Sequence, residues 1–205
     1  MFNKCSSLTN ATKLPATTLA EYCYNYMFNG CSSLTTLPEN LLPATTLATS
    51  CYFYMFSGCK ALTNAPKLPA TTLAENCYFY MFNKCASLTT VPENLLPATT
   101  LASYCYNYMF NGCSSLTNAP KLPATTLAEN CYRYMFGSCS KLKEVYCNAR
   151  YNADGSEITT SIGSYWLYGA PDTADCIFYK NKDWSGPTTR DYNTIPSNWQ
   201  IATYS

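Results

Sequence analysis

The chain has 205 residues, which is enough for one or two domains with a sizeable core. Its net charge is +1 and only 12% of its residues are charged, so the composition excludes a basic face that would bind nucleic acid. Apolar residues make up 47% of the sequence, which excludes a disordered chain, and no apolar stretch approaches the ~18–20 residues needed for membrane insertion.

The sequence repeats itself from its first residue. Met-Phe occurs six times, at spacings of 26, 28, 26, 28 and 26 residues. The longer spacings contain connectors such as 38–43, Pro-Glu-Asn-Leu-Leu-Pro, where the shorter ones have connectors such as 66–69, Pro-Lys-Leu-Pro. Periods of 20–29 residues with recurring leucines are typical of leucine-rich repeats, in which each repeat forms one coil of a solenoid. We therefore predict a solenoid of five to six coils over residues 1–147.

The first coil begins inside a repeat. Met1 stands where every other repeat has its Met, and the polar residues that follow it do not form a signal peptide. Terminal coils of a solenoid need polar caps because each coil buries its faces against its neighbours. We therefore expect either a fragment of a longer, exported chain or a bare first coil, with Phe2, Leu8 and Leu19, that packs on another molecule and so supports self-association.

One side of each coil reads as a short strand. Residues 62–65, Leu-Thr-Asn-Ala, precede a proline that cannot donate a hydrogen bond to a ladder, which keeps the strand short. Solenoids commonly bind partners on the concave sheet, so the polar row on this side is a candidate recognition surface, although a structural side-chain ladder explains it equally well. The row consists of Asn10, Thr36, Asn64, Thr90 and Asn118.

The other side of each coil reads as a short helix. Residues 72–75, Thr-Leu-Ala-Glu, match a capping box, and Leu73, Cys77 and Met81 fall along one helical stripe. The spacing predicts a helix over 73–81 and, with the strands, a right-handed α/β solenoid. Its predicted core ladder contains Leu19, Leu47, Leu73, Leu101, Leu127, Cys31, Cys59, Cys85 and Cys113.

The 13 cysteines form two ladders, with Cys147 and Cys176 outside both. A laddered Cys has equivalent neighbours above and below, so buried free thiols explain the ladders better than a disulfide framework. A Cys147–Cys176 bridge is an alternative for the remaining pair. Because the chain has no histidine and no Cys-x2-Cys pair, we expect no metal site, no cofactor and no catalysis from the repeats.

Three further files of side chains recur from coil to coil. One tyrosine file is a candidate aromatic binding surface, although the structural alternative, rings that flank the core with hydroxyls that reach water, is the favoured one; the file contains Tyr24, Tyr52, Tyr78, Tyr106 and Tyr132. A second tyrosine file contains Tyr26, Tyr54, Tyr80, Tyr108 and Tyr134. A charged file alternates in sign and is expected to set coil register; it contains Lys13, Glu39, Lys67, Glu93 and Lys121.

Composition changes after Cys147. All three tryptophans and all five aspartates lie in 148–205, together with many turn signals and short apolar bursts. We predict a small irregular or β cap that covers the last coil. Asp172, Asp175 and Asp183 match no known Ca²⁺ loop, and an enzyme in this segment would need a nucleophile and a base in one cleft.

The rhythm Phe-x-x-Cys-x-x-Leu, as in residues 56–62, resembles the BspA-like class of leucine-rich repeats. The unit Leu-Pro-Ala-Thr-Thr-Leu-Ala followed by Cys-Tyr-x-x-Met-Phe is similar to repeats of surface proteins from gut anaerobic bacteria and their phages. The resemblance implies export and adhesion. The leading hypothesis is a non-enzymatic extracellular binding module for a protein or glycan partner; the alternatives are a receptor-binding component of a phage tail and an enzyme in the terminal segment.

Overall fold

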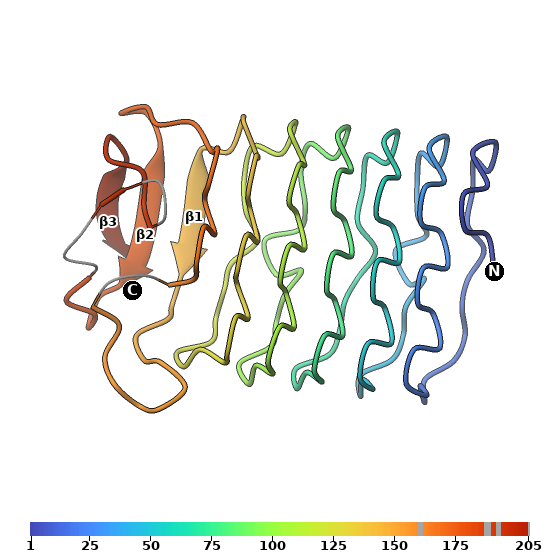
Figure 1. The fold of residues 1–205 in the computed structure, drawn as a ribbon, viewed down its shortest axis with the longest axis horizontal. Coiled ribbons are helices and arrows are strands. Elements are labelled where there is room, and N and C mark those ends of the chain that lie inside the picture. Colours follow the sequence, from blue (N-terminus) through green and yellow to red (C-terminus); the bar gives the residue numbers. More distant parts are fainter. Residues whose placement is uncertain (160–161, 187–189, 192–193, 205) are drawn as a thin grey trace.

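The chain winds into a row of stacked coils in the computed structural model (Figure 1), which describes residues 1–159, 162–186, 190–191 and 194–204. A file of phenylalanine rings passes through this stack with one ring from each coil. Neighbouring ring centroids in the file lie 5.6–5.7 Å apart and the rings are nearly parallel. The file contains Phe2, Phe28, Phe56, Phe82, Phe110 and Phe136, and Trp166 continues it.

Strands are confined to one side of the stack, which we call the strand wall. The described strands are β1 (Glu144–Cys147), β2 (Ile177–Asn181) and β3 (Gln200–Tyr204), and they form one parallel sheet in the order β1-β2-β3. Earlier coils contribute isolated parallel bridges such as Thr46↔Thr72. Prolines flank these bridges and cannot donate to a ladder, so the pairing there stays short.

The predicted helices are wrong, and so is the α/β class. The described residues contain no helix, and therefore none that could cross a membrane. Residues 74–85 are instead a run of tight turns, in which the Met81 N–H donates to Tyr78 O (3.1 Å). The intervening N–H groups leave the coil: that of Tyr80 donates to Asn107 O of the next coil (3.0 Å). An α-helix would use all of these groups internally.

We call this side the turn wall, formed by residues 20–31, 48–59, 74–85, 102–113, 128–139 and 163–170. Its chain direction reverses at every fourth residue, where φ is positive: 54° at Asn76, 55° at Tyr80 and 59° at Lys84. The left-handed conformation costs about 1–2 kcal/mol for each residue other than glycine. The same conformation recurs at equivalent positions of successive coils, so their backbones run parallel and can pair. The resulting hydrogen bonds to the next coil and the stacked side chains offset the conformational cost.

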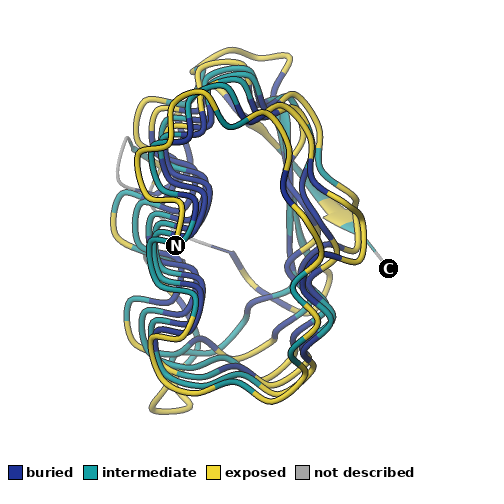
Figure 2. Cartoon of the chain, turned by 90° about the vertical axis from the view of Figure 1, so that its right-hand side faces the viewer, coloured by how far each residue is buried: buried dark blue, intermediate teal, exposed yellow. Residues whose placement is uncertain are grey.

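The core lies between the two walls, where Figure 2 shows buried segments facing the interior of the ring. Leu73 and Leu127 of the predicted ladder are buried, whereas Leu19, Leu47 and Leu101 are half-buried against the core. The ladder cysteines are fully buried, and each thiol donates to a phenylalanine carbonyl of the preceding coil, as Cys59 does to Phe28 O (3.2 Å); they are Cys31, Cys59, Cys85 and Cys113.

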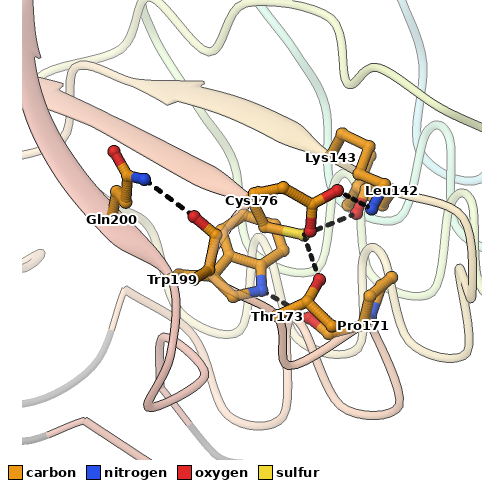
Figure 3. Close-up of polar contacts among 9 residues, drawn as sticks. Leu142, Lys143, Pro171, Thr173, Cys176, Trp199 and Gln200 are labelled. Carbon is orange, nitrogen blue, oxygen red and sulfur yellow. Dashed lines mark hydrogen bonds and ion pairs between the residues drawn. The ribbon is translucent and has the colours of Figure 1, made fainter.

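All 13 cysteines are free thiols. The alternative of a Cys147–Cys176 bridge is wrong, because β1 and β2 place Cys147 opposite Lys180. Cys176 instead lies just before β2, between Leu142 O of the preceding coil (3.7 Å) and Thr173 Oγ1 (3.3 Å), as Figure 3 shows.

The winding continues beyond residue 147, so the predicted boundary marks a change of side chains within one stack. The Tyr134 N–H donates to Ser164 O (3.1 Å), in the same way as earlier coils bond to their successors. The three tryptophans are at most 1% exposed and close the end of the core. Their indole N–H groups donate to backbone carbonyls 26–28 residues away: Trp166 to Thr194, Trp184 to Ile158 and Trp199 to Pro171.

Candidate functional site

The strand wall is grooved because its connectors alternate in length. Connectors 38–43 and 92–97 each have two more residues than their neighbours 66–69 and 120–123. Their first halves, residues 38–40 and 92–94, are exposed, and we call these two connectors ledges. A cavity of about 330 Å³ lies between the two ledges, over connector 66–69. A second cavity of about 570 Å³ lies on the other side of the ledge 92–97, against Lys121. Asn94 and Pro97 line both cavities.

The cavities combine an apolar floor with charged walls. Leu68, Pro69 and Leu95 lie in the first cavity, which has Glu39 and Lys67 at its side. The Lys67 ammonium is 2.7 Å from the Glu39 carboxylate, and Lys121 makes the equivalent ion pair with Glu93 one 54-residue unit further on. Both pairs are well exposed, so each contributes only ~0–1 kcal/mol. The backbone N–H of Lys67 also donates to Glu39 O (2.7 Å), which joins the two coils at this point.

The polar Asn and Thr row lies on the same wall. Asn10, Thr36, Thr90 and Asn118 are exposed. Asn64 is half-buried, and its side chain is already used: its Nδ2 donates to Leu37 O and its Oδ1 accepts from the Leu37 N–H, both at 2.9 Å. Asn64 therefore fastens one coil to the preceding one, and the exposed members of the row remain as candidate contacts.

The candidate tyrosine surface needs a correction, because four of its five members are core residues. Only Tyr24 is half-buried. The others are 1% exposed and stack at 5.7–6.1 Å between ring centroids, so no ligand can reach them; they are Tyr52, Tyr78, Tyr106 and Tyr132. Burial raises the pKa of Tyr78, Tyr106 and Tyr132 well above the ordinary value of 10.0.

The second tyrosine file lies at the outer side of the turn wall. Its rings are half-buried and stack at 4.4–4.9 Å, and Tyr165 continues the file beyond the repeats. Because each ring face covers its neighbour, this file presents ring edges and hydroxyls to the solvent. The two files differ in burial because two consecutive buried residues recur every four residues along the turn wall. In residues 74–85 these pairs are Cys77 with Tyr78 and Met81 with Phe82, and Tyr80 lies between them.

Two tyrosines that the sequence analysis did not single out lie on the strand wall just before its last strand, β3. Tyr146 on β1 and Tyr179 on β2 are in register, and their rings stack with centroids 4.1 Å apart. The Lys121 ammonium lies 5.4 Å from the Tyr146 ring centroid, so the pair adjoins the second cavity. Burial, the hydrogen bond that the Tyr146 hydroxyl shares with Tyr179 and the Glu144 charge raise the pKa of Tyr146 to about 12.

The groups that an enzyme would need are dispersed. Asp172 accepts from the Asn198 N–H (2.7 Å), Asp175 pairs with Lys143 (2.5 Å), and the Asp183 N–H donates to Asn181 (2.7 Å). The Lys143 ammonium lowers the pKa of Asp175 to about 2. Across the described ranges, no three His, Cys, Asp or Glu side chains lie together as a metal site would require.

No protein-family model, curated protein or solved structure matches this chain.

The first coil has one exposed apolar side chain among its three predicted contacts. Phe2 is 41% exposed, whereas Leu8 and Leu19 are half-buried. Self-association through this coil stays a prediction.

Proposed function

We propose that the protein is a non-enzymatic binding module that presents its strand wall to a protein or glycan partner at a cell surface. The observation that carries this proposal is the pair of cavities that flank the ledge 92–97. Binding sites typically combine a concave, largely apolar surface with a few polar groups that fix orientation. Here leucines and prolines form the floor, and Asn94 with the two Lys–Glu pairs supplies the polar groups.

The repeat supports this role because it presents the same contacts more than once. Glu39, Lys67 and Pro69 recur 54 residues later as Glu93, Lys121 and Pro123. Two equivalent contacts on one rigid stack raise the affinity for a partner that itself repeats, since the second contact forms without a new loss of translational freedom. The cell-surface setting is proposed from the resemblance of the repeats.

The test is a binding screen on an array of extracellular matrix proteins and glycans, followed by titration of the strongest ligand. Asn94→Arg places a bulky charge in both cavities and should weaken binding at least tenfold. Asn40→Arg is the matched control, because Asn40 occupies the same position in the preceding ledge and lines neither cavity. The control should stay within twofold of the parent chain.

Two outcomes would count against the proposal. If the parent chain binds no member of the array, the binding function is wrong. If both substitutions weaken binding equally, the partner contacts the ledges rather than the cavities.

A further inference from the structure

The two stacked rings of Tyr146 and Tyr179 differ in how neighbouring side chains cover their faces. The ring of Tyr146 has Lys121 over one face and Tyr179 over the other. Tyr179 is half-buried, and Tyr146 covers one of its faces. Its other face is directed along the sheet toward β3, because stacked side chains in a parallel sheet follow the hydrogen-bonding direction.

The residue in register with Tyr179 on β3 is Ala202. A methyl group at this position covers little of the neighbouring ring. β3 is also the outermost strand in the order β1-β2-β3, and among the residues that the structure describes no further strand pairs with it. The stacked pair therefore ends at a position where one more flat ring would fit against Tyr179.

A polar side chain and an aromatic side chain flank Ala202 along β3. Gln200 and Tyr204 lie two residues before and after Ala202, so they share its face of the strand. Gln200 is exposed, and its Nε2 donates to Ala174 O (2.7 Å), which holds the side chain beside the sheet and leaves Oε1 to accept a hydrogen bond. Tyr204 is half-buried and meets the Tyr146 ring edge-on, with centroids 5.8 Å apart at 76°.

We propose that the place above Ala202 is a subsite for one pyranose ring of a neutral glycan, which stacks on the open face of Tyr179. A pyranose has an apolar C–H face that packs on an aromatic ring and a rim of hydroxyls that pairs with amides and phenols. Gln200 lies beside Ala202, where that rim would lie, with its Oε1 available as an acceptor. An aromatic or proline side chain of a peptide would stack on the ring but has no hydroxyl to donate to the Gln200 Oε1, so a pyranose makes one more contact.

The inference rests on the proposed binding function and names one class of partner for it. A glycan with its terminal ring on Tyr179 would lie on the strand wall, which also carries Lys121 and the second cavity. Lys121 therefore adjoins both the aromatic pair and the groove.

The test uses an array of neutral oligosaccharides built from pyranose rings, with the strongest ligand then titrated by calorimetry. Tyr179→Ala removes the stacking surface and should weaken binding at least tenfold. Ala202→Tyr supplies the protein with the next ring of the stack and should block the sugar to the same degree while Tyr179 stays in place. Thr203→Tyr is the control, because it adds the same side chain to β3 on the opposite face, and it should stay within twofold.

The outcomes separate this inference from the binding function on which it rests. An unchanged melting temperature in Ala202→Tyr, together with lost glycan binding, supports the subsite. Unchanged glycan affinity in Ala202→Tyr, or no glycan bound by the parent chain, overturns it. If a matrix protein still binds and Asn94→Arg still weakens it, the binding function stands without the glycan subsite. Binding of an aromatic peptide that Ala202→Tyr abolishes would assign the site to peptides and overturn the glycan proposal.

Discussion

The turn wall and the strand wall have the same repeat but differ in what holds them. On the turn wall, every second N–H donates to the next coil, and from Cys51 onward the phenylalanine, cysteine and first tyrosine files are buried in every repeat. On the strand wall, coils meet at isolated bridges, exposed ion pairs and connectors of two lengths. On the turn wall, identical side chains of successive coils stack on one another. On the strand wall, the alternating connector lengths produce ledges and cavities. The turn wall is therefore the scaffold, and the strand wall is the side on which we propose that a partner binds.

The largest effect that we expect comes from alkaline pH, which acts on the turn wall. Burial raises the pKa of Cys51, Cys59 and Cys113 from 9.0 to about 12. Below pH 9 these thiols are protonated in both states, so their contribution to stability is complete. Between pH 9 and about 12 the unfolded chain releases protons that the folded chain retains, and the free energy of unfolding falls.

Urea unfolding midpoints measured under reducing conditions from pH 7 to 12 test this expectation. The midpoint should be constant up to about pH 9 and then fall steeply, because several thiols and buried tyrosines titrate together. A midpoint that stays flat to pH 11 would show that water reaches the thiols and that the turn wall is not a dry stack.

An intermediate effect is expected at Tyr106, which is 1% exposed and whose hydroxyl has no hydrogen-bond partner in the part of the chain that the structure describes. Tyr106→Ala removes a buried ring and should cost about 3–5 kcal/mol of the free energy of unfolding. Tyr106→Phe keeps the ring and removes an unsatisfied polar atom, so it should be neutral or stabilising. Urea titration of both variants measures whether the free energy of unfolding changes in these two directions. A loss in Tyr106→Phe as large as that in Tyr106→Ala would mean that the hydroxyl has a structural partner.

These walls also show which features could be predicted from the sequence. The repeats indicated that Cys77 and Met81 are buried, and both are 0% exposed. The helix was wrong because a burial period of four residues is close to the helical period of 3.6, and no local signal distinguishes the two. The capping box was equally misleading: Glu75 is exposed, and its carbonyl accepts from the Ser50 N–H of the preceding coil.

The candidate site was harder to predict because it depends on distant pairs. Alternating connectors were visible, but the cavities arise from how ledge 92–97 projects beyond connectors 66–69 and 120–123. Tyr146 and Tyr179 are 33 residues apart, and their stacking depends on the register of β1 and β2. The sequence in 148–205 does not repeat the earlier pattern, so no internal comparison could establish that register.

The smallest effect concerns the backbone of the turn wall, where one position is Gly30, Gly58 and Gly112 in three coils but Lys84 in another, always with positive φ. Gly58→Ala should lower the free energy of unfolding by about 1 kcal/mol. The added Cβ meets nothing closer than 3.6 Å, so the cost is conformational rather than steric. Lys84→Gly should raise the free energy of unfolding by up to about 1 kcal/mol for the same reason.

Lys60→Gly is the control, at an exposed position that is not among those with positive φ. It should instead lower the free energy of unfolding by roughly 0.5–1 kcal/mol, because glycine there only adds freedom to the unfolded chain. Urea titration of the three variants measures these differences. If Lys84→Gly and Lys60→Gly change stability in the same direction, the left-handed turn is not a source of strain, and the turn wall would need no compensation from its stacked side chains.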